Sequence, residues 1–542
     1  MKNLFLVLIV AVAIFLRFWH IGVNPPSLTW DEAAWGYNAY SLGIDGKDEF
    51  GKSLPVTYLE SFGDFKPPLY AYIDILPVKF FGLNEFSTRF PSALFGVGTV
   101  ILTFLLVKKM FGSSETGKIS LISAALLAIS PWHILLSRAA FEANVASFFI
   151  VLGVYLFLFS QERYRWLIVF SVTSFTLSMY TFNTARIVSP ILLVGLLLIK
   201  RQNIWLKMRK EVILGGFVGA ILFAPLLLFL TTPQAKLRFN EVNIFSDPSV
   251  VTTSNQEIQN DNNAFFSKII HNRRLLYSVE YVKHYFDNLN PQFLFIKGDG
   301  NPKFSIQDVG QMYIWEIPFF VAGIFFLFKK KDKNWWVLPY WLFIGIIPAA
   351  TARETPHALR IEAILPTMQI LTAYGVVLVF AKIPNSYKSI QLRKLSTVIV
   401  AVIALLNFVY FYHNYTVSYP KEFSGEWQYG YKDAISYVDD VKDSYNKVIV
   451  TEDLGRPYIY FLFYGKYSPE SFRQSAVIQR EALGFVHVNS FDKFIFTKDV
   501  ATTKPEGNNL YIDVPGNIPQ NVKVLKTFRL LNGSASLVAY VR

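Results

Sequence analysis

The segment SLTWDEAAWGYNAYSL, residues 27–42, places two adjacent acids, Asp31 and Glu32, just after the first long apolar run of the chain. A carboxylate at membrane depth costs free energy unless it is paired or hydrated, so an acid at this position is a functional candidate. Trp and Tyr prefer the boundary between lipid and water. Four of them flank the acids: Trp30, Trp35, Tyr37 and Tyr40. We therefore expect the rest of the chain to hold this acidic pair at a membrane surface.

The composition is typical of a membrane protein. Of the 542 residues, 52% are hydrophobic and 50 are Phe, and the mean hydropathy is +0.33. The net charge of +13 could indicate nucleic-acid binding, but Lys and Arg gather in short loops between apolar runs, a pattern typical of membrane orientation. We expect no nucleic-acid partner. The chain has no cysteine, which excludes disulfides and thiolate metal sites.

Apolar runs divide the chain into eleven expected membrane spans. About 20 residues are needed to cross ~30 Å of hydrocarbon, and fewer suffice when the ends snorkel. The spans are predicted near residues 4–22, 88–107, 119–136, 144–160, 166–182, 187–199, 212–230, 312–328, 335–350, 359–381 and 395–413. Residues 1–22 could pass for a signal peptide. The apolar run continues through residues 17–20 without a small-residue cleavage site, which favours a retained span.

The basic residues predict the orientation. Alternate connections are rich in Lys and Arg, and by the positive-inside rule they are cytoplasmic. These connections are residues 108–118, 163–165, 200–210, 329–333 and 382–394. We expect an integral plasma-membrane protein whose N-terminus is cytoplasmic and whose C-terminal tail is extracytoplasmic.

Two long outer connections and the tail carry further structure. In the loop 24–87, residues 31–42 and 69–81 read as helices lying in the membrane interface. The loop 231–311 has a polar centre at 254–263, expected to be partly mobile. It also has an interfacial helix at 277–286 and an irregular stretch at 291–311.

The predicted domains are a transmembrane catalytic domain, 1–414, and a small α/β or α+β domain, 415–542. The second domain is expected to contain a helix at 427–441. Its strands are predicted at 447–451, 491–497, 509–514, 522–529 and 535–541. Asn532-Gly533 indicates a hairpin between the last two, since both residues tolerate positive φ.

Ionisable and amide side chains concentrate on the predicted outer side. The candidate site residues are Asp31, Glu32, Lys66, Arg89, Arg138, Glu142, Asn144, Arg186, His357 and Arg360. One acid and several cations suit transfer of a sugar from a polyprenyl phosphate. The departing phosphate is an anion and needs fixed positive charge, and the attacking hydroxyl needs a base.

Each candidate has an expected role. Asp31 is the candidate base, and Glu32 could orient it or hold a cation. Lys66 and Arg138 are the leading phosphate contacts, and the second rank is Arg89, Arg186 and Arg360. The supporting residues are Glu142, Asn144 and His357.

At these residues the chain resembles the membrane-embedded GT-C glycosyltransferases, in the branch of protein O-mannosyltransferases and aminoarabinose transferases. The resemblance covers roughly residues 1–200, through W-D-E (30–32), K-P-P-L (66–69) and R-F-P-S-A-L-F-G (89–96), with P-H-A-L-R (356–360) further on. It implies a polytopic α-helical fold of about eleven spans with a small C-terminal soluble domain. It further implies that Asp31 is the base, that Lys66 contacts the donor phosphate, that the donor is prenyl-linked and that the anomeric centre inverts.

Other readings remain open from the sequence. The acids could only cap a helix, Lys66 could be a snorkelling anchor, and Arg138 and Glu142 could form a local ion pair. A non-enzymatic transporter or flippase would show broken helices and charges at mid-membrane, whereas the predicted span centres here are almost free of charge. A glycan-binding receptor would leave the loop chemistry unexplained. A divalent cation on the two adjacent carboxylates stays possible, and the acceptor could be a lipid, a glycan or a protein.

Overall fold

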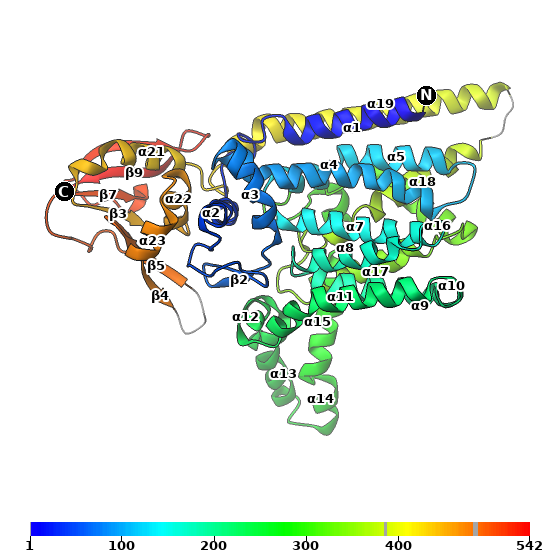
Figure 1. Cartoon of the computed structure of the whole chain (residues 1–542), viewed down its shortest axis with the longest axis horizontal. Coiled ribbons are helices and arrows are strands. Elements are labelled where there is room, and N and C mark those ends of the chain that lie inside the picture. The colour runs from blue at the N-terminus through cyan, green and yellow to red at the C-terminus, as the bar shows by residue number, and fades with distance from the viewer. Residues whose placement is uncertain (1, 384–386, 481–485) are drawn as a thin grey trace. The chain divides into compact units, whose positions relative to one another are not determined.

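The computed structural model describes residues 2–383, 387–480 and 486–542, and these form two compact units (Figure 1). The helical unit comprises Met1–Leu16, Phe95–Leu136 and Ala143–Phe411. The mixed unit comprises Arg17–Leu94, Ser137–Glu142 and Tyr412–Arg542. The first long connection and the C-terminal residues thus belong to one compact unit. The predicted domain boundary at residue 414 separates a transmembrane part from an extracytoplasmic part. Division into compact units does not distinguish these two parts, so the boundary stays a prediction.

A helix lies at each predicted span. These helices are α1 (Lys2–Phe18), α4 (Glu85–Met110), α5 (Thr116–Ile129) with α6 (Pro131–Arg138), α7 (Glu142–Ser160), α8 (Leu167–Met179), α9 (Ala185–Ile199), α11 (Arg209–Leu230), α16 (Ile317–Lys330), α17 (Val337–Ala350), α18 (Thr367–Ala381) and α19 (Tyr387–His413). The span predicted at 119–136 is bent by 55° between α5 and α6. Pro131 begins α6 there, and proline cannot donate the backbone hydrogen bond that would continue the preceding helix.

In the part of the chain that the structure describes, fewer helices than the eleven predicted spans have the length and composition of a full membrane span. Four helices of the described chain are long and apolar enough to cross a membrane: Glu85–Met110, Glu142–Ser160, Arg209–Leu230 and Ile390–Glu422. Two bent pairs, α5 with α6 and α9 with α10 (Arg201–Lys207), raise that number to six if each is one span. Shorter apolar helices account for other predicted spans. The total of eleven stays a prediction.

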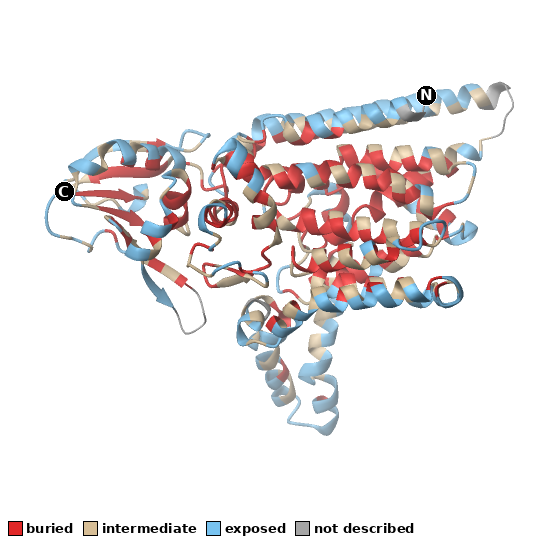
Figure 2. Cartoon of the chain, viewed as in Figure 1, coloured by how far each residue is buried: buried red, intermediate tan, exposed pale blue. Residues whose placement is uncertain are grey.

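The core of the helical unit is a continuous apolar cluster from α4 to α18, which includes Phe157, Trp341 and Tyr374. Figure 2 shows buried residues concentrated in the middle of this bundle. The closest helix contact joins α16 and α18. A Cβ on Gly323 would lie 1.9 Å from the Leu371 carbonyl oxygen, and one on Gly375 would lie 1.8 Å from the Phe319 carbonyl oxygen. Only glycine permits this approach.

The connection 231–311 is more helical than its polar composition suggests. It contains α12 (Pro233–Val242), α13 (Pro248–Asn260), α14 (Phe265–Ile270) and α15 (Arg273–Asp287). Asp247 caps α13 and Pro248 takes its first position, while Asn272 caps α15; these are strong helix-start signals. The polar centre at 254–263 therefore lies largely in α13. After α15 and a short π-helical turn at Gln292–Ile296, the chain is irregular to residue 311, as predicted.

The mixed unit contains a seven-stranded sheet among its described residues, with strand order β4-β5-β6-β3-β7-β9-β8. The strands are β3 (Lys447–Thr451), β4 (Val477–Arg480), β5 (Val486–Phe491), β6 (Phe494–Thr497), β7 (Asn509–Asp513), β8 (Lys523–Arg529) and β9 (Ala535–Val541). Central β3 pairs in parallel with β6 and β7, and the other pairs are antiparallel.

Most of the predicted strands are confirmed, and the predicted hairpin at Asn532-Gly533 joins β8 to β9, with φ of +89° at Gly533. The strand predicted at 491–497 is wrong in its first half. Phe491 ends β5, the chain turns at Asp492 with φ of +50°, and β6 begins at Phe494. The helix predicted at 427–441 begins later, as α21 (Tyr431–Val441).

The remaining elements of the mixed unit surround the candidate acids. They are α2 (Trp30–Asp45), the hairpin β1 (Leu59–Ser61) and β2 (Asp64–Lys66), α3 (Leu69–Phe81), α20 (Tyr419–Glu422), α22 (Pro457–Tyr464) and α23 (Pro469–Ser475). Helices α2 and α22 belong to one apolar cluster with the sheet. A Cβ on Gly36 of α2 would lie 2.5 Å from the Phe463 ring of α22. The C-terminal residues therefore support the helix that carries Asp31.

Candidate functional site

The first turn of α2 is held by a capping box. The Thr29 hydroxyl oxygen accepts a hydrogen bond from the Glu32 backbone N–H at 3.3 Å, and the Thr29 N–H donates to Glu32 Oε2 at 2.9 Å. This arrangement satisfies two backbone donors that a helix start leaves open. Glu32 therefore does cap the helix, as one reading of the sequence allowed, while Asp31 takes no part in the capping box.

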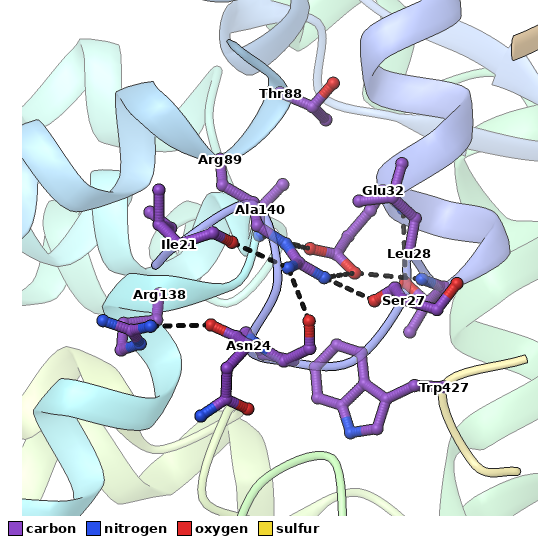
Figure 3. Close-up of polar contacts among 12 residues, drawn as sticks. Ile21, Asn24, Ser27, Leu28, Glu32, Thr88, Arg89, Arg138, Ala140 and Trp427 are labelled. Atoms are coloured by element: carbon purple, nitrogen blue, oxygen red, sulfur yellow. Dashed lines mark hydrogen bonds and ion pairs between the residues drawn. The ribbon is translucent and has the colours of Figure 1, made fainter. Parts of the chain in front are cut away.

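Glu32 also forms a buried ion pair with Arg89. Arg89 Nε donates to Glu32 Oε1 at 2.8 Å and Nη2 donates to Oε2 at 3.3 Å, and both side chains are fully buried (Figure 3). The Ala140 N–H adds a fourth donor, after those of Arg89 and the Thr29 N–H, 2.9 Å from Oε1. Both oxygens of this carboxylate are thus occupied by protein groups.

The guanidinium of Arg89 uses its remaining donors on one short backbone segment. Nη1 donates to the carbonyl oxygens of Ile21 at 2.9 Å and Pro25 at 2.8 Å, and Nη2 donates to that of Ser27. With the two bonds to Glu32, these contacts occupy the five N–H donors of an arginine. Arg89 therefore ties α4 to the chain that leads into α2, and in this arrangement it offers no donor to a phosphate.

Asp31, one residue before Glu32, lies in a different environment. Its carboxylate forms an ion pair with Lys66, and its side chain is 49% exposed, compared with 0% for Glu32. Lys66 ends β2, and its ammonium is nearly buried, 5.3 Å from the Trp35 ring and 5.2 Å from the Phe62 ring. Of the two acids, only Asp31 is therefore accessible to a substrate.

Several carboxylates surround the Lys66 ammonium. Burial alone would lower the pKa of Lys66, but the negative charges of Asp31, Asp64 and Glu142 outweigh it and raise the pKa above the ordinary lysine value. Lys66 thus stays positively charged at neutral pH. Glu142, a predicted supporting residue at the start of α7, is within electrostatic range of this ammonium.

Arg138 is the other leading predicted phosphate contact, and it is buried in the mixed unit. Its Nε donates to the Tyr415 hydroxyl at 3.0 Å, and its Nη2 donates to the carbonyl oxygens of Trp19 and Asn24, each at 2.8 Å. These bonds hold Arg138 against the same connection, residues 19–27, that Arg89 contacts (Figure 3).

The four other predicted site residues belong to the helical unit. Asn144 is buried on α7, and Arg186, in the first turn of α9, donates from Nε to the Met179 carbonyl oxygen at 3.3 Å. The His357 ring packs on Phe304, with 4.8 Å between ring centroids. Arg360 Nη1 donates to the Glu354 carbonyl oxygen at 3.1 Å. Asp31, Glu32, Lys66, Arg89, Arg138 and Glu142 belong to the mixed unit, and Asn144, Arg186, His357 and Arg360 belong to the helical unit.

Three further side chains of the mixed unit were not predicted from the sequence as part of the site. The Trp427 ring stacks 5.8 Å from the Arg89 guanidinium carbon. The Tyr460 hydroxyl of α22 donates to the Leu28 carbonyl oxygen at 3.1 Å, just before α2. Glu49 is fully buried, which raises the pKa of its carboxyl to about 8. No local sequence signal marks Trp427 and Tyr460, because their partners are far away in the chain.

A divalent cation on the adjacent acids does not fit the observed geometry. Both Glu32 oxygens already accept N–H donors, and among the described residues no group of three or more His, Asp or Glu side chains is placed to hold a metal ion.

The fold is that of the membrane-embedded GT-C glycosyltransferases, which confirms the resemblance inferred from the motifs. The structure of ArnT from Cupriavidus metallidurans bound to undecaprenyl phosphate aligns with 99% of this chain and 97% of its own, with a TM-score of 0.54 and 12% identity. Residues 7–236, which include Asp31, Lys66 and Arg138, match the family model described as dolichyl-phosphate-mannose-protein mannosyltransferase.

Two relatives show the same similarity in sequence. An uncharacterized protein of Aquifex aeolicus (strain VF5) is 34% identical over 158 residues, which is 29% of each chain. The putative mannosyltransferase YkcB of Bacillus subtilis (strain 168) is 29% identical over 133 residues, which is 24% of this chain and 18% of YkcB. The matches thus span less than a third of either relative.

Proposed function

We propose that this protein is a glycosyltransferase that moves a sugar from a polyprenyl-phosphate-linked donor to a hydroxyl acceptor at the outer face of the membrane, with inversion. The observation that carries the proposal is the pairing of the accessible Asp31 carboxylate with the Lys66 ammonium, inside the segment that matches the mannosyltransferase family model. The fold shared with ArnT, which was solved with undecaprenyl phosphate, supports a prenyl-linked donor.

In the proposed reaction Asp31 is the base. As the acceptor oxygen forms its bond to the anomeric carbon, an Asp31 oxygen takes the hydroxyl proton. The bond from the anomeric carbon to the phosphate oxygen breaks, and prenyl phosphate leaves with the electron pair. Attack from the side opposite the phosphate gives inversion. The Lys66 ammonium pairs with the Asp31 carboxylate.

The cations have two different roles in this proposal. Lys66 is the first candidate for the donor phosphate, because it is charged and lies beside the base, and fixed positive charge stabilises the departing anion. Arg138, Arg186 and Arg360 remain candidate phosphate contacts, and Glu142, Asn144 and His357 remain supporting residues. We assign Arg89 and Glu32 to positioning, because their bonds are made within the protein.

The proposal is tested by Asp31→Asn in the full-length protein in nanodiscs. The probe is polyprenyl-phosphate-linked mannose, with other prenyl-linked sugars in parallel, and the readout is release of prenyl phosphate in the presence of hydroxyl acceptors. We expect transfer to fall at least about 10²–10⁴-fold, the usual contribution of a general base. The matched control is Asp433→Asn, an exposed acid in the first turn of α21, which should keep full activity. Transfer by Asp31→Asn at the native rate would exclude Asp31 as the base.

The proposed orientation has its own test, because the native chain has no cysteine. Ser468→Cys, at an exposed position before α23, should react with a membrane-impermeant maleimide on intact cells. Lys331→Cys, in the basic connection after α16, should react only after the cells are opened. The reverse result would contradict an extracytoplasmic C-terminus.

A further inference from the structure

Helices α13, α14 and α15 form an arm that extends from the side of the helical bundle (Figure 1). In the sequence the arm, residues 248–287, comes between α11 and α16, two apolar helices of the same unit. Its base is fixed to α17 by tyrosines of α15. The Tyr285 hydroxyl donates to the Phe343 carbonyl oxygen at 3.0 Å, and that of Tyr281 donates to the Ile347 carbonyl oxygen at 3.4 Å.

Another face of α15 carries an exposed apolar stripe. Its members are 47–62% exposed and follow the 4-3-4 spacing of one helix face: Leu275, Val279, Val282 and Phe286. The stripe continues on α14 at the tip of the arm, where Phe265 is 81% exposed and Phe266 is 68% exposed. A continuous apolar surface of this kind marks an interaction site rather than ordinary exposure.

The charges beside this surface indicate an anionic partner. Lys268, Arg273 and Arg274 are exposed around the tip, and none of them forms an ion pair with a carboxylate of the described chain. The nearby acids Glu257 and Asp261 instead lie 2.6 and 3.2 Å from the two ring nitrogens of His271. Three cations next to exposed phenylalanines are the pattern of a helix that lies in a lipid headgroup layer.

The other layer of the arm is polar. Helix α13 exposes Thr252, Asn255, Gln256 and Gln259. The arm thus has one apolar layer with cations at its tip and one polar layer, which suits a boundary between lipid and water better than a contact with a soluble protein.

We propose that the arm lies along the membrane surface, with the apolar stripe of α14 and α15 among acyl chains and the tip cations on lipid phosphates. Helix α15 contacts the middle of α17 through the Phe343 carbonyl oxygen. It contacts the region of the C-terminal end of α17 through the carbonyl oxygens of Ile347 and, from His284, Ala352. The basic connection 329–333 precedes the other end of α17. The arm therefore lies in the leaflet away from those lysines. This inference goes beyond the proposed sugar transfer and does not depend on it.

Single cysteines in the cysteine-free protein test the inference. Phe265→Cys and Val282→Cys, labelled with the fluorophore NBD, probe the apolar layer, and Gln256→Cys, on the exposed side of α13, is the matched control. The full-length protein is placed in phosphatidylcholine vesicles containing phosphatidylglycerol and in nanodiscs of the same lipids with one protein each. Acyl-chain nitroxides should quench NBD at 265 and 282 and leave 256 unchanged, whereas aqueous iodide should quench only 256.

Two results would overturn the proposal. Iodide quenching at 265 and 282 equal to that at 256 would place the apolar layer in water. Shielding from iodide that appears only in vesicles with many copies, and not in single-copy nanodiscs, would identify the stripe as a contact between two copies of the chain.

A triple variant tests the cations. Lys268→Gln combined with Arg273→Gln and Arg274→Gln should reduce nitroxide quenching at 265 in phosphatidylglycerol vesicles. Unchanged quenching would remove the phosphate contacts from the proposal.

Discussion

The Arg89 Nε atom lies 2.8 Å from Glu32 Oε1, and both side chains are completely buried. The neighbouring Asp31 carboxylate is half exposed and pairs with Lys66. The two adjacent acids thus occupy different environments: Glu32 is enclosed by the protein, and Asp31 is half exposed. In a helix, consecutive side chains point about 100° apart, so a single turn can direct one acid to a structural contact and the next to a substrate.

Breaking the buried pair should cost much more stability than breaking a surface pair. Glu32→Gln removes the charge that compensates Arg89, and an uncompensated buried charge typically costs about 3–5 kcal/mol. Thermal unfolding in detergent, followed by circular dichroism, measures the loss. The control is Glu60→Gln, whose partner Arg480 is largely exposed, and for which about 0–1 kcal/mol is expected. Equal losses in the two variants would show that the Arg89 pair does not support the fold.

Replacing Lys66 should weaken use of the donor more than it weakens the fold. Lys66→Met keeps the length of the side chain but removes the charge proposed to contact the donor phosphate. We expect a raised KM for the prenyl-linked donor, a lowered kcat, and an unchanged KM for the acceptor. Lys79→Met, at the exposed end of α3, is the control. Unchanged donor kinetics in Lys66→Met would remove Lys66 from the phosphate site.

The raised pKa of Lys66 also predicts the pH range of its ion pair. A lysine whose folded pKa exceeds its unfolded value stabilises the fold fully below the unfolded value, and this stabilisation is lost as pH rises through the folded pKa. Burial raises the pKa of the Glu142 carboxyl to about 7 and the Lys66 ammonium lowers it, so the comparison is made in a Glu142→Gln background. There the stability difference between the chain with Lys66 and Lys66→Met should be constant through neutral pH and decrease only in the alkaline range. A decrease between pH 6 and 8 would contradict this assignment.

Glu49 should make stability fall with rising pH. Burial, with the nearby charges of Asp48 and Glu60, raises the pKa of Glu49 from 4.5 to about 8. Between these values the folded chain holds a proton that the unfolded chain has released, so stability decreases by up to about 1.4 kcal/mol per pH unit. In Glu49→Gln the slope should become less steep by this amount, whereas Glu506→Gln, in an exposed loop, should retain the native slope. Urea unfolding at pH 5, 6, 7 and 8 provides the measurement.

Through Tyr460, the C-terminal helix α22 should position the segment that carries Asp31. Its hydroxyl contacts the Leu28 carbonyl oxygen, one residue before the Thr29 cap of α2. Tyr460→Phe leaves that buried oxygen without its partner, at a cost of about 1–3 kcal/mol, and should lower kcat more than it raises the donor KM. The control is Tyr431→Phe, because the Tyr431 ring stacks 4.4 Å from Tyr460 and its buried hydroxyl has no hydrogen-bond partner among the described residues. Equal kcat values in the two variants would rule out this positioning role.

Local sequence patterns predicted much of the fold. Apolar runs located a helix at each expected span, and alternating residues located β3, β7, β8 and β9, because length and periodicity are properties of neighbouring residues. The strands β4 and β5 and the helices α22 and α23 were not predicted. Helix α22, PYIYFLFY, is apolar on all sides because it is buried on all sides, so its sequence carries no helical period.

For the site, the sequence by itself determined which residues could act: the W-D-E and K-P-P-L motifs identified Asp31 and Lys66, and the tertiary structure shows these two side chains in contact. Only the tertiary structure determined which charged and polar groups pair with one another. Arg89 is 57 residues from Glu32, and Tyr460 is 432 residues from Leu28, so no local pattern links them. Whether a cation faces a substrate or a carboxylate depends on which distant segments pack around it, because burial selects the partner that best compensates each charge.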